Sequence, residues 1–281
     1  MQPSVLWWHL VAAGVVQTAK RSLLISVSHS LRLAILVPTY NESKNVDTLL
    51  GALADVCKLH PGTDTSVFVL DDSSPDGTAG VVTRAAQRLQ SECFRVQLIT
   101  RPVKEGLGKA YIDGLSRMLR LSDPPEFVLQ MDADLSHHPK YLTDFIALAS
   151  SGCDFVLGSR YIPGGSSPNW QWHRKLLSRG GNMYARLVLG SHVSDYTGGY
   201  NMYSLELLKR IDLTRLNHTG YGFLIDLKYK AASVCHRLGQ VPIEFTEREH
   251  GVSKMPASTI WRNFFMVLSI KFKNSIDHLI R

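Results

Sequence analysis

The feature that most constrains the fold is an alternation of short apolar runs with amphipathic segments, which begins at Leu33. Runs with the length of buried strands lie at 33–38, 66–72, 95–100, 126–134 and 154–159. Between them, the spacing of apolar residues predicts helices over 45–58, 78–89, 108–119 and 141–149. Strands and helices that alternate in this way form βαβ units with right-handed crossovers. We therefore expect an α/β fold with a mostly parallel central sheet and flanking helices on both faces.

Polar residues gather directly after four of these predicted strands. The clusters are PTYNE (38–42), DDSSPDG (71–77), RPVKEGLGKA (101–110) and DADLSHH (132–138). Ligands of parallel α/β sheets bind beyond the carboxyl ends of the strands, so the four clusters predict a single cleft. The first turn lacks the G-x-G-x-x-G pattern, which argues against a dinucleotide site of the Rossmann type.

Two aspartates in this region, Asp132 and Asp134, are separated by one residue at the end of an apolar run. Alternate residues of a strand lie on the same side, so both carboxylates would share a site that Mg²⁺ or Mn²⁺ suits. His137 and His138 are adjacent and point differently, which makes them poor joint ligands of zinc. A helix start before Pro139 is the alternative, and it explains the histidines better than the aspartates.

A third aspartate, Asp72, follows the second strand, where a carboxylate can hold a ribose or a base edge. A turn with Ser74 and Gly77 is the alternative, and the two interpretations are compatible because Asp71 is adjacent.

The chain is basic: its 281 residues carry a formal charge of +7. This charge suits a polyanionic partner, such as nucleic acid, an acidic membrane surface or a phosphorylated substrate. Surface charge that only keeps the protein soluble explains it equally well. No nucleic-acid-binding motif is present, so we expect no nucleic-acid partner. Arg160, Arg174, Arg248 and Lys254 are candidates for binding phosphate, since they lie beside the other motifs.

Both ends of the chain differ from the central part. Residues 1–30 form an apolar extension whose run at 5–16 is too short to cross a bilayer as a helix. Residues 31–255 form the α/β domain expected here, with the predicted cleft. Residues 256–281 have the pattern of a basic amphipathic helix, which suits either the membrane interface or packing against that domain.

Together these motifs resemble the dolichyl-phosphate (polyprenyl-phosphate) mannosyltransferases, inverting glycosyltransferases of the GT-A fold. The matching blocks occur in the family's order between Leu33 and Met255, and FTEREHGVSKM is most similar to the actinobacterial polyprenyl-monophosphomannose synthases. The blocks are PTYNE, DDSSPDGT, GLGKAY, MDADLSHHP, GSRY, HRKLLSRG, DYTGGYNMY, GYGFLIDLKYKA and EREHGVSKM.

The resemblance implies a role for individual residues. Those that would hold the nucleotide are Pro38, Tyr40, Glu42 and Asp72. Asp132 and Asp134 would bind the metal and the sugar diphosphate, with Ser136 where some members have a Gln ligand. The lipid phosphate would be received by Arg160, Arg174 and Ser178. A loop with Arg248, Ser253 and Lys254 would close over the diphosphate.

The implied reaction transfers mannose from GDP-mannose to a polyprenyl monophosphate with inversion, on the cytoplasmic face of a membrane to which the protein binds peripherally. A phosphate acceptor is mostly dianionic at neutral pH, so no carboxylate needs to act as a base. The chain departs from the family at Asn201, Leu224 and Asp226, which places the sugar in question more than the reaction. The alternatives are UDP-glucose, giving a polyprenyl-phosphate glucosyltransferase, or another sugar donor.

Overall fold

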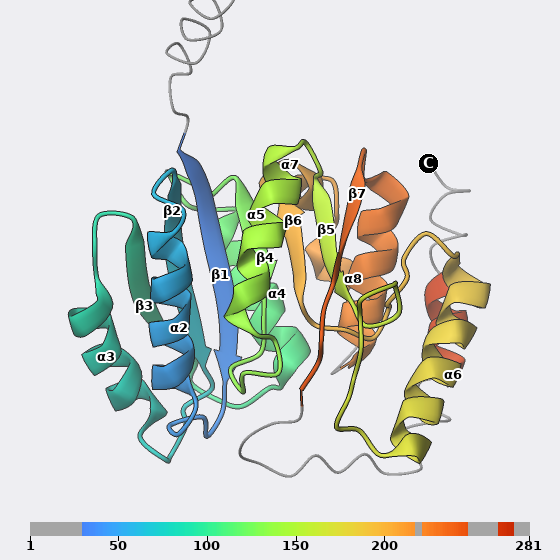
Figure 1. Cartoon of the computed structure of the whole chain (residues 1–281), viewed down its shortest axis with the longest axis horizontal. Coiled ribbons are helices and arrows are strands. Elements are labelled where there is room, and N and C mark those ends of the chain that lie inside the picture. Colours follow the sequence, from blue (N-terminus) through green and yellow to red (C-terminus); the bar gives the residue numbers. More distant parts are fainter. Residues whose placement is uncertain (1–29, 217–220, 247–263, 273–281) are drawn as a thin grey trace, which may run out of the picture.

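The structure, a computed structural model, describes residues 30–216, 221–246 and 264–272 (Figure 1). The strands are β1 (Leu31–Thr39), β2 (Thr63–Asp71), β3 (Phe94–Thr100), β4 (Phe127–Gln130), β5 (Phe155–Ser159), β6 (Asn201–Ser204) and β7 (Leu238–Pro242). The helices are α2 (Val46–Lys58), α3 (Thr78–Leu89), α4 (Leu107–Met118), α5 (Leu142–Ser150), α6 (Trp172–Leu189), α7 (Leu205–Lys209) and α8 (Tyr221–Val234). Short 3₁₀ turns, η1 (Pro139–Tyr141) and η2 (Leu213–Arg215), complete the described elements.

The strands form one seven-stranded sheet in the order β3-β2-β1-β4-β6-β5-β7. Strand β6 pairs antiparallel with β4 and β5, and the other pairs are parallel. The predicted α/β fold with a mostly parallel sheet is confirmed. Because β6 lies between β4 and β5, it separates the sheet into one side that contains β1–β4 and another that contains β5 and β7.

Alternate residues of β1 enter two different cores, as the period of a strand requires. Leu33, Ile35 and Val37 pack with helices α2, α3 and α5 on one face. Ala34 and Leu36 pack with α4, α8 and the end of α6 on the other face. Because both faces are covered, residues 33–37 of the strand are all apolar and buried, which is why it could be recognised from the sequence.

Strand β4 is shorter than expected and ends at Gln130 rather than at Asp134. Asp132 and Asp134 therefore lie in a loop, and the argument that strand geometry aligns their side chains was wrong. The loop turns sharply, since Leu135 between Asp134 and Ser136 has a φ of 63°. Local hydrogen bonds described below, and not the pleat, orient the two carboxylates.

The predicted N-terminal extension (1–30) lies almost wholly outside the described residues, and so does most of 256–281. Of that C-terminal segment, residues 264–272 are helical, with Val267 and Ile270 buried and Phe265 and Phe272 exposed. The ring of Phe264 stacks on Tyr184 of α6, with centroids 4.4 Å apart. Among the described residues, no helix combines the length and apolar character that crossing a bilayer requires.

Candidate active site

The polar clusters after β1, β2 and β3 are joined by hydrogen bonds between main-chain groups and hydroxyl side chains. The Asn41 and Glu42 N–H groups donate to the hydroxyls of Ser74 and Thr78, both at 3.0 Å. The Ser73 hydroxyl donates to the Arg101 carbonyl at 2.6 Å. The sequence therefore placed these three clusters correctly at one edge of the sheet.

The adjacent aspartates after β2 have different partners. Asp71 makes the turn, because its carboxylate accepts from the Ser74 N–H at 3.0 Å and from the Thr39 hydroxyl at 3.0 Å. Asp72 is buried and ion-paired with Arg101, which is also buried. The turn predicted from Asp72 thus belongs to Asp71, and the orientation of Asp72 is set by Arg101. Sequence reasoning assigned no role to Arg101, although it lies at the end of β3.

The other predicted nucleotide-binding residues lie in the same region. Pro38 is the penultimate residue of β1, and Tyr40 follows the strand with its ring partly exposed. The ammonium group of Lys104 lies 3.5 Å from the centre of that ring. Glu42 accepts a hydrogen bond from the Asn45 side chain at 2.7 Å. A partly exposed aromatic ring with a cation over one face is suited to a nucleotide, whose base can stack on a ring and whose phosphates are anionic.

The loop after β4 orients Asp134 through Ser136. The Asp134 carboxylate accepts from the Ser136 hydroxyl at 2.6 Å and from the Ser136 N–H at 3.1 Å. Both side chains are almost completely buried. Ser136 therefore positions the aspartate, a role that was not predicted for it; its predicted role as a metal ligand stays a prediction.

His137 orients the main chain of the same loop. Its Nδ1 accepts from the Asp132 N–H at 2.9 Å, so the neutral ring carries its proton on Nε2. Burial lowers the pKa of His137 and so favours this neutral form, although the charge of Asp132 opposes the shift. His138 instead accepts from the Lys140 N–H and begins η1, as the helix-start interpretation predicted.

The residues of this loop fit a divalent cation of the magnesium type. Asp132, Asp134 and Ser136 offer only hard oxygen donors, which suit Mg²⁺ or Mn²⁺ and not a soft metal. Two carboxylates leave coordination positions for water and for diphosphate oxygens. Within the described parts of the chain, no group of three or more His, Cys, Asp or Glu side chains is placed to enclose a metal by itself.

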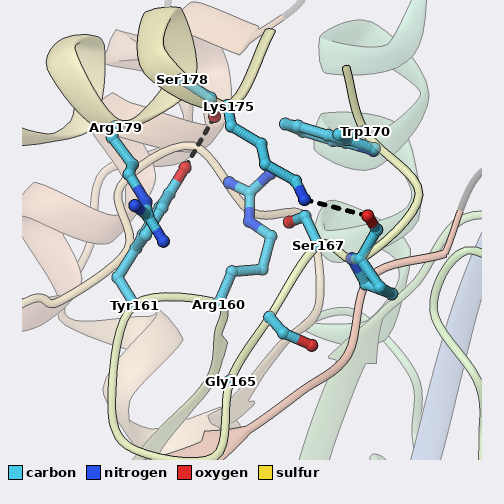
Figure 2. A pocket seen from close by; sticks show the side chains of 10 residues that line it. Arg160, Tyr161, Gly165, Ser167, Trp170, Lys175, Ser178 and Arg179 are labelled. Atoms are coloured by element: carbon cyan, nitrogen blue, oxygen red, sulfur yellow. Dashed lines mark hydrogen bonds between the residues drawn. The ribbon is translucent and has the colours of Figure 1, made fainter. Parts of the chain in front are cut away.

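A cavity of about 140 Å³ lies between the loop after β5 and helix α6 (Figure 2). Its lining residues combine cations, hydroxyls and one indole, and Trp170 contributes a buried Nε1 without a hydrogen-bond partner. They are Arg160, Tyr161, Gly165, Ser166, Ser167, Pro168, Trp170, Lys175, Ser178 and Arg179. Three cations and an unpartnered donor around a small cavity are suited to an oxyanion.

The predicted acceptor residues are assembled around this cavity. Arg160 and Ser178 line it, and the Ser178 hydroxyl lies 2.6 Å from the Tyr161 hydroxyl. The guanidinium groups of Arg160 and Arg174 lie 5.4 and 4.0 Å from the ring centre of Trp170. Arg174 is therefore beside the pocket and not among its lining residues. Lys175 and Arg179 line the pocket, although neither was chosen as a candidate.

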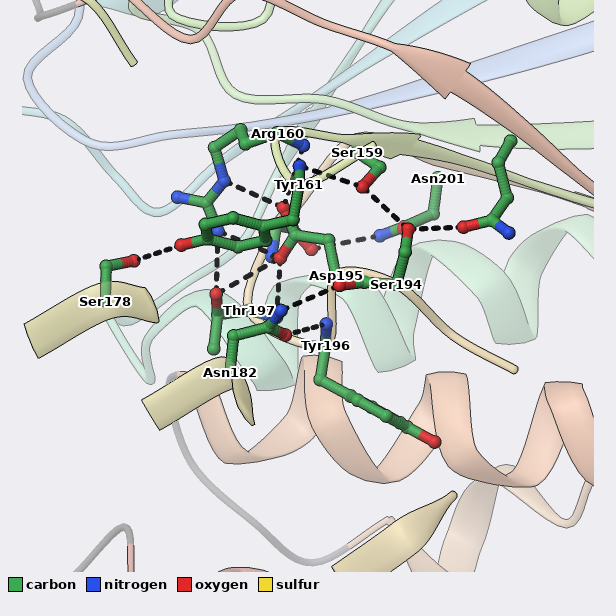
Figure 3. Close-up of polar contacts among 12 residues, drawn as sticks. Ser159, Arg160, Tyr161, Ser178, Asn182, Ser194, Asp195, Tyr196, Thr197 and Asn201 are labelled. Atoms are coloured by element: carbon green, nitrogen blue, oxygen red, sulfur yellow. Dashed lines mark hydrogen bonds and ion pairs between the residues drawn. The ribbon is translucent and has the colours of Figure 1, made fainter. Parts of the chain in front are cut away.

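A buried ion network fixes the position of Arg160 (Figure 3). Its Nε and Nη2 donate to the two carboxylate oxygens of Asp195 at 2.8 and 2.9 Å, and both residues are buried. Burial alone would raise the pKa of Asp195, but the charge and hydrogen bonds of Arg160 hold it well below its ordinary value. The Thr197 hydroxyl accepts a further bond from Arg160 at 2.6 Å. The guanidinium plane is therefore fixed before any ligand binds.

Below this network lies Lys228 of α8, a fully buried lysine that sequence reasoning missed. Its ammonium donates to the carbonyls of Asp195 at 2.7 Å and of Gly198 at 2.5 Å. Burial lowers the pKa of Lys228 to about 7, and the charge of Asp195 opposes the shift. Lys228 thus holds the loop 195–199 that connects the two halves of the site.

The remaining predicted residues have other surroundings. Arg248, Ser253 and Lys254 lie outside the described residues. Of the positions that depart from the family pattern, Leu224 packs in a core cluster, and Asp226 is buried with Lys230 at 3.2 Å. Asn201 is buried in β6. These three side chains thus lie in the interior and contribute to packing there.

The fold and the sequence can now be compared with known proteins. Residues 34–212 match the family described as Glycosyl transferase family 2. The chain belongs to this family. It is a glycosyltransferase with the GT-A fold, as its sequence motifs predicted.

Two similar curated proteins have informative names. The chain is 37% identical over 252 residues to the polyprenol monophosphomannose synthase of Mycolicibacterium smegmatis, with 90% of this chain and 91% of that protein covered. It is 38% identical over 231 residues to the undecaprenyl-phosphate mannosyltransferase of Micrococcus luteus, covering 82% and 90%. The recognition of the family from the motif blocks is confirmed.

Solved structures support the fold alone, because their sequence identity is low. Mannosyl-3-phosphoglycerate synthase from Rubrobacter xylanophilus has a TM-score of 0.59 at 20% identity, over 93% of this chain and 77% of that one. A mannosyltransferase from Pyrobaculum calidifontis, in complex with GDP-Man and Mn²⁺, has a TM-score of 0.53 at 19% identity, over 93% and 70%.

Proposed function

We propose that this protein transfers mannose from GDP-mannose to a polyprenyl monophosphate with inversion, and that it requires Mg²⁺ or Mn²⁺. The names of the two relatives, both above 35% identity over most of their length, support the acceptor class and the sugar. The geometry supports a reaction between two phosphorylated substrates.

The observation that carries the proposal is that an acidic loop and a basic pocket belong to one connected site. A Cβ on Gly199 would lie 3.6 Å from the Asp132 carboxylate, so the loop 195–199 runs beside the proposed metal site. Four residues earlier, Asp195 holds Arg160 at the pocket. The acidic side suits a cation with a diphosphate, and the basic side suits a second phosphate.

In the proposed reaction, an oxygen of the lipid phosphate attacks the anomeric carbon, and the bond from that carbon to the nucleoside diphosphate breaks. The attacking oxygen is already ionised at neutral pH, so the carboxylates are not needed as bases. Arg160, Arg174 and Ser178 would hold the acceptor phosphate against its repulsion from the diphosphate. Lys175 would add a further positive charge to the pocket. Their contribution is positioning together with charge neutralisation.

The cation would be held by Asp132 and Asp134 and would stabilise the charge of the leaving diphosphate. On the donor side, Tyr40 and Asp72 would contact the nucleotide. Arg248 and Lys254 are proposed to close over the diphosphate, as the family resemblance implies.

The donor and the metal are tested directly by incubating the protein with polyprenyl phosphate, Mg²⁺ and either labelled GDP-mannose or labelled UDP-glucose. We expect label from GDP-mannose alone to enter an acid-labile lipid, and chelator to prevent it. Transfer from UDP-glucose would favour the glucosyltransferase, and transfer in chelator would remove the metal from the mechanism.

The acceptor assignment is tested by Arg174→Ala. Loss of the guanidinium beside Trp170 should raise the KM for polyprenyl phosphate about tenfold or more and leave the KM for the nucleotide sugar unchanged. Arg117→Ala, which removes a surface arginine paired with Asp113, is the matched control. Equal increases in both KM values would contradict the acceptor role.

We also propose that the protein binds peripherally to the cytoplasmic face of a membrane. Its acceptor would be embedded there, and the basic chain would be attracted to anionic headgroups.

A further inference from the structure

Helix α6 has an unusual distribution of side chains, because its large apolar residues face outward. Trp172, Leu176, Met183 and Leu187 are 61–78% exposed. Their spacings of four, seven and four residues place them on one face of the helix. On the opposite side, only Asn182, Ala185 and Leu189 are buried. A contiguous exposed apolar face of this kind marks a binding surface.

The same face continues onto the helical residues 264–272. Phe264 stacks on Tyr184, and the Tyr184 hydroxyl donates to the Phe264 carbonyl at 3.1 Å. Phe265 and Phe272 are 63% and 66% exposed, whereas Val267 and Ile270 of this segment are buried. In Figure 1, α6 lies at the outer edge of the molecule with this segment beside it.

The charge of these elements indicates what covers the face. Helix α6 contains no Asp or Glu, and its basic side chains are His173, Arg174, Lys175, Arg179 and Arg186. Residues 264–272 contain Lys271 and no acidic residue. Apolar and aromatic side chains flanked by cations are complementary to the surface of a bilayer with anionic headgroups.

The pocket lies on the flank of this helix. Lys175, Ser178 and Arg179 line the cavity, while Leu176 and Met183 lie on the outward side. A second hollow of about 550 Å³ shares Arg160 and Arg179 with the first and reaches Met183. The phosphate of a polyprenyl acceptor could therefore bind in the pocket while its lipid chain remained embedded in a bilayer that faces α6.

We propose that the outward face of α6, continued by Phe265 and Phe272, docks on an anionic bilayer and holds the pocket at the level of the headgroups. The inference rests on the proposed function for the identity of the acceptor, but membrane docking itself can be measured without turnover. It names the partner of this surface as a lipid bilayer, and not a second copy of the chain.

The test is co-flotation of the full chain with vesicles of phosphatidylcholine and phosphatidylglycerol, for the wild type and for Leu176→Glu/Leu187→Glu. Two charges on the apolar face should lower vesicle binding about tenfold or more. Leu59→Glu/Leu121→Glu alters two exposed leucines on other elements and should bind as the wild type does. Raising the salt concentration should weaken binding to these vesicles and not to pure phosphatidylcholine.

Activity then separates this inference from the proposed function. The Glu variant should lose about tenfold or more of its turnover on long-chain polyprenyl phosphate in vesicles and keep its turnover on a water-soluble ten-carbon prenyl phosphate. Retained activity on the soluble acceptor also shows that the variant is folded, and Leu187→Ser provides a milder second variant.

Three results would overturn the docking surface: unchanged vesicle binding by both variants, an equal loss of activity on both acceptors, or a wild-type dimer in solution that becomes monomeric in the Glu variant. A different result would overturn the proposed function and not the docking surface. In that case the Glu variant would lose vesicle binding as expected, but the wild type would transfer sugar to neither acceptor.

Discussion

The two sides of the proposed active site are held in place by different kinds of interaction. After β1, β2 and β3, loop N–H and carbonyl groups bind short hydroxyl side chains such as Ser73, Ser74 and Thr78. Around β5 and α6, the loop 195–199 is instead held by the charged side chains of Arg160, Asp195 and Lys228, all buried. Apart from the buried Asp72–Arg101 pair, the proposed donor half has many weak and interchangeable bonds, whereas the proposed acceptor half depends on a few bonds between desolvated charges. Loss of one hydroxyl should therefore be tolerated on the proposed donor side, whereas loss of one buried charge should be costly on the proposed acceptor side.

The largest effect on activity is expected at Asp134, one of the two carboxylates of the proposed metal site. Replacement by Ala removes a carboxylate from the proposed metal site, so we expect turnover to fall by at least about 100-fold together with the loss of metal dependence. Activity measured across a metal titration checks this. The fold should survive, and activity that persists in chelator would show that Asp134 binds no metal.

The next largest effect tests the acceptor half. Asp195→Asn keeps the shape of the side chain but leaves the buried Arg160 without its counter-charge, which should lower the free energy of unfolding by about 3–5 kcal/mol. Asp212→Asn, on the surface beside Arg215 at 3.2 Å, is the control and should change it by less than about 1 kcal/mol. Denaturant titrations of the two variants give the comparison. Similar losses in both would mean that burial does not set the difference.

The buried Lys228 should make the stability of the protein depend on pH, which gives a third test of the comparison. Its pKa is lowered by burial to about 7 in the folded protein from an ordinary value of 10.5, so the unfolded chain binds more protons between these values. Stability contributed by this group should therefore rise with pH from about 7 to 10.5. Unfolding of the wild type and of Lys228→Met across this range is the measurement. The rise should be absent in the variant, and an identical pH dependence in both proteins would contradict the assignment.

The smallest effect is expected on the donor side, at Ser74. Its hydroxyl accepts from the Asn41 N–H and donates to Asp71, yet the neighbouring loops keep several other bonds. Ser74→Ala should lower the free energy of unfolding by only about 1 kcal/mol and change the KM for the nucleotide sugar less than about threefold. A loss comparable to that of Asp195→Asn would remove the distinction between the halves.

The same contrast explains what could be predicted from the sequence. Helix α3 begins and ends at the predicted residues, Thr78 and Leu89, because apolar periodicity and a preceding turn are local signals. The clusters after the parallel strands were found for a similar reason, since each follows its own strand. Hydrogen bonding within the loop after β4 is also local. It depends, however, on a positive φ at Leu135, which no pattern in the sequence indicated.

The acceptor half depends on contacts between distant residues. Asp195 is 35 positions from Arg160, and Lys228 is 30 positions from Gly198. Contacts over such separations produce no periodic pattern in the sequence from which they could be predicted. A lysine in α8 is expected on the surface, and only its carbonyl partners explain its burial. The outward face of α6 was missed as well, because an apolar stripe is the same in sequence whether it faces a core or a membrane.

Helix α6 carries pocket residues such as Ser178 on one flank and outward leucines such as Leu176 on another, and this arrangement has a kinetic consequence. A catalyst placed in this way encounters one substrate in three dimensions and the other in two. With the proposed function, its nucleotide product would diffuse away into water, while its glycosylated lipid would stay in the plane of the leaflet. The relevant concentration of acceptor is then a surface density, so adding inert phospholipid at constant total acceptor should slow the reaction.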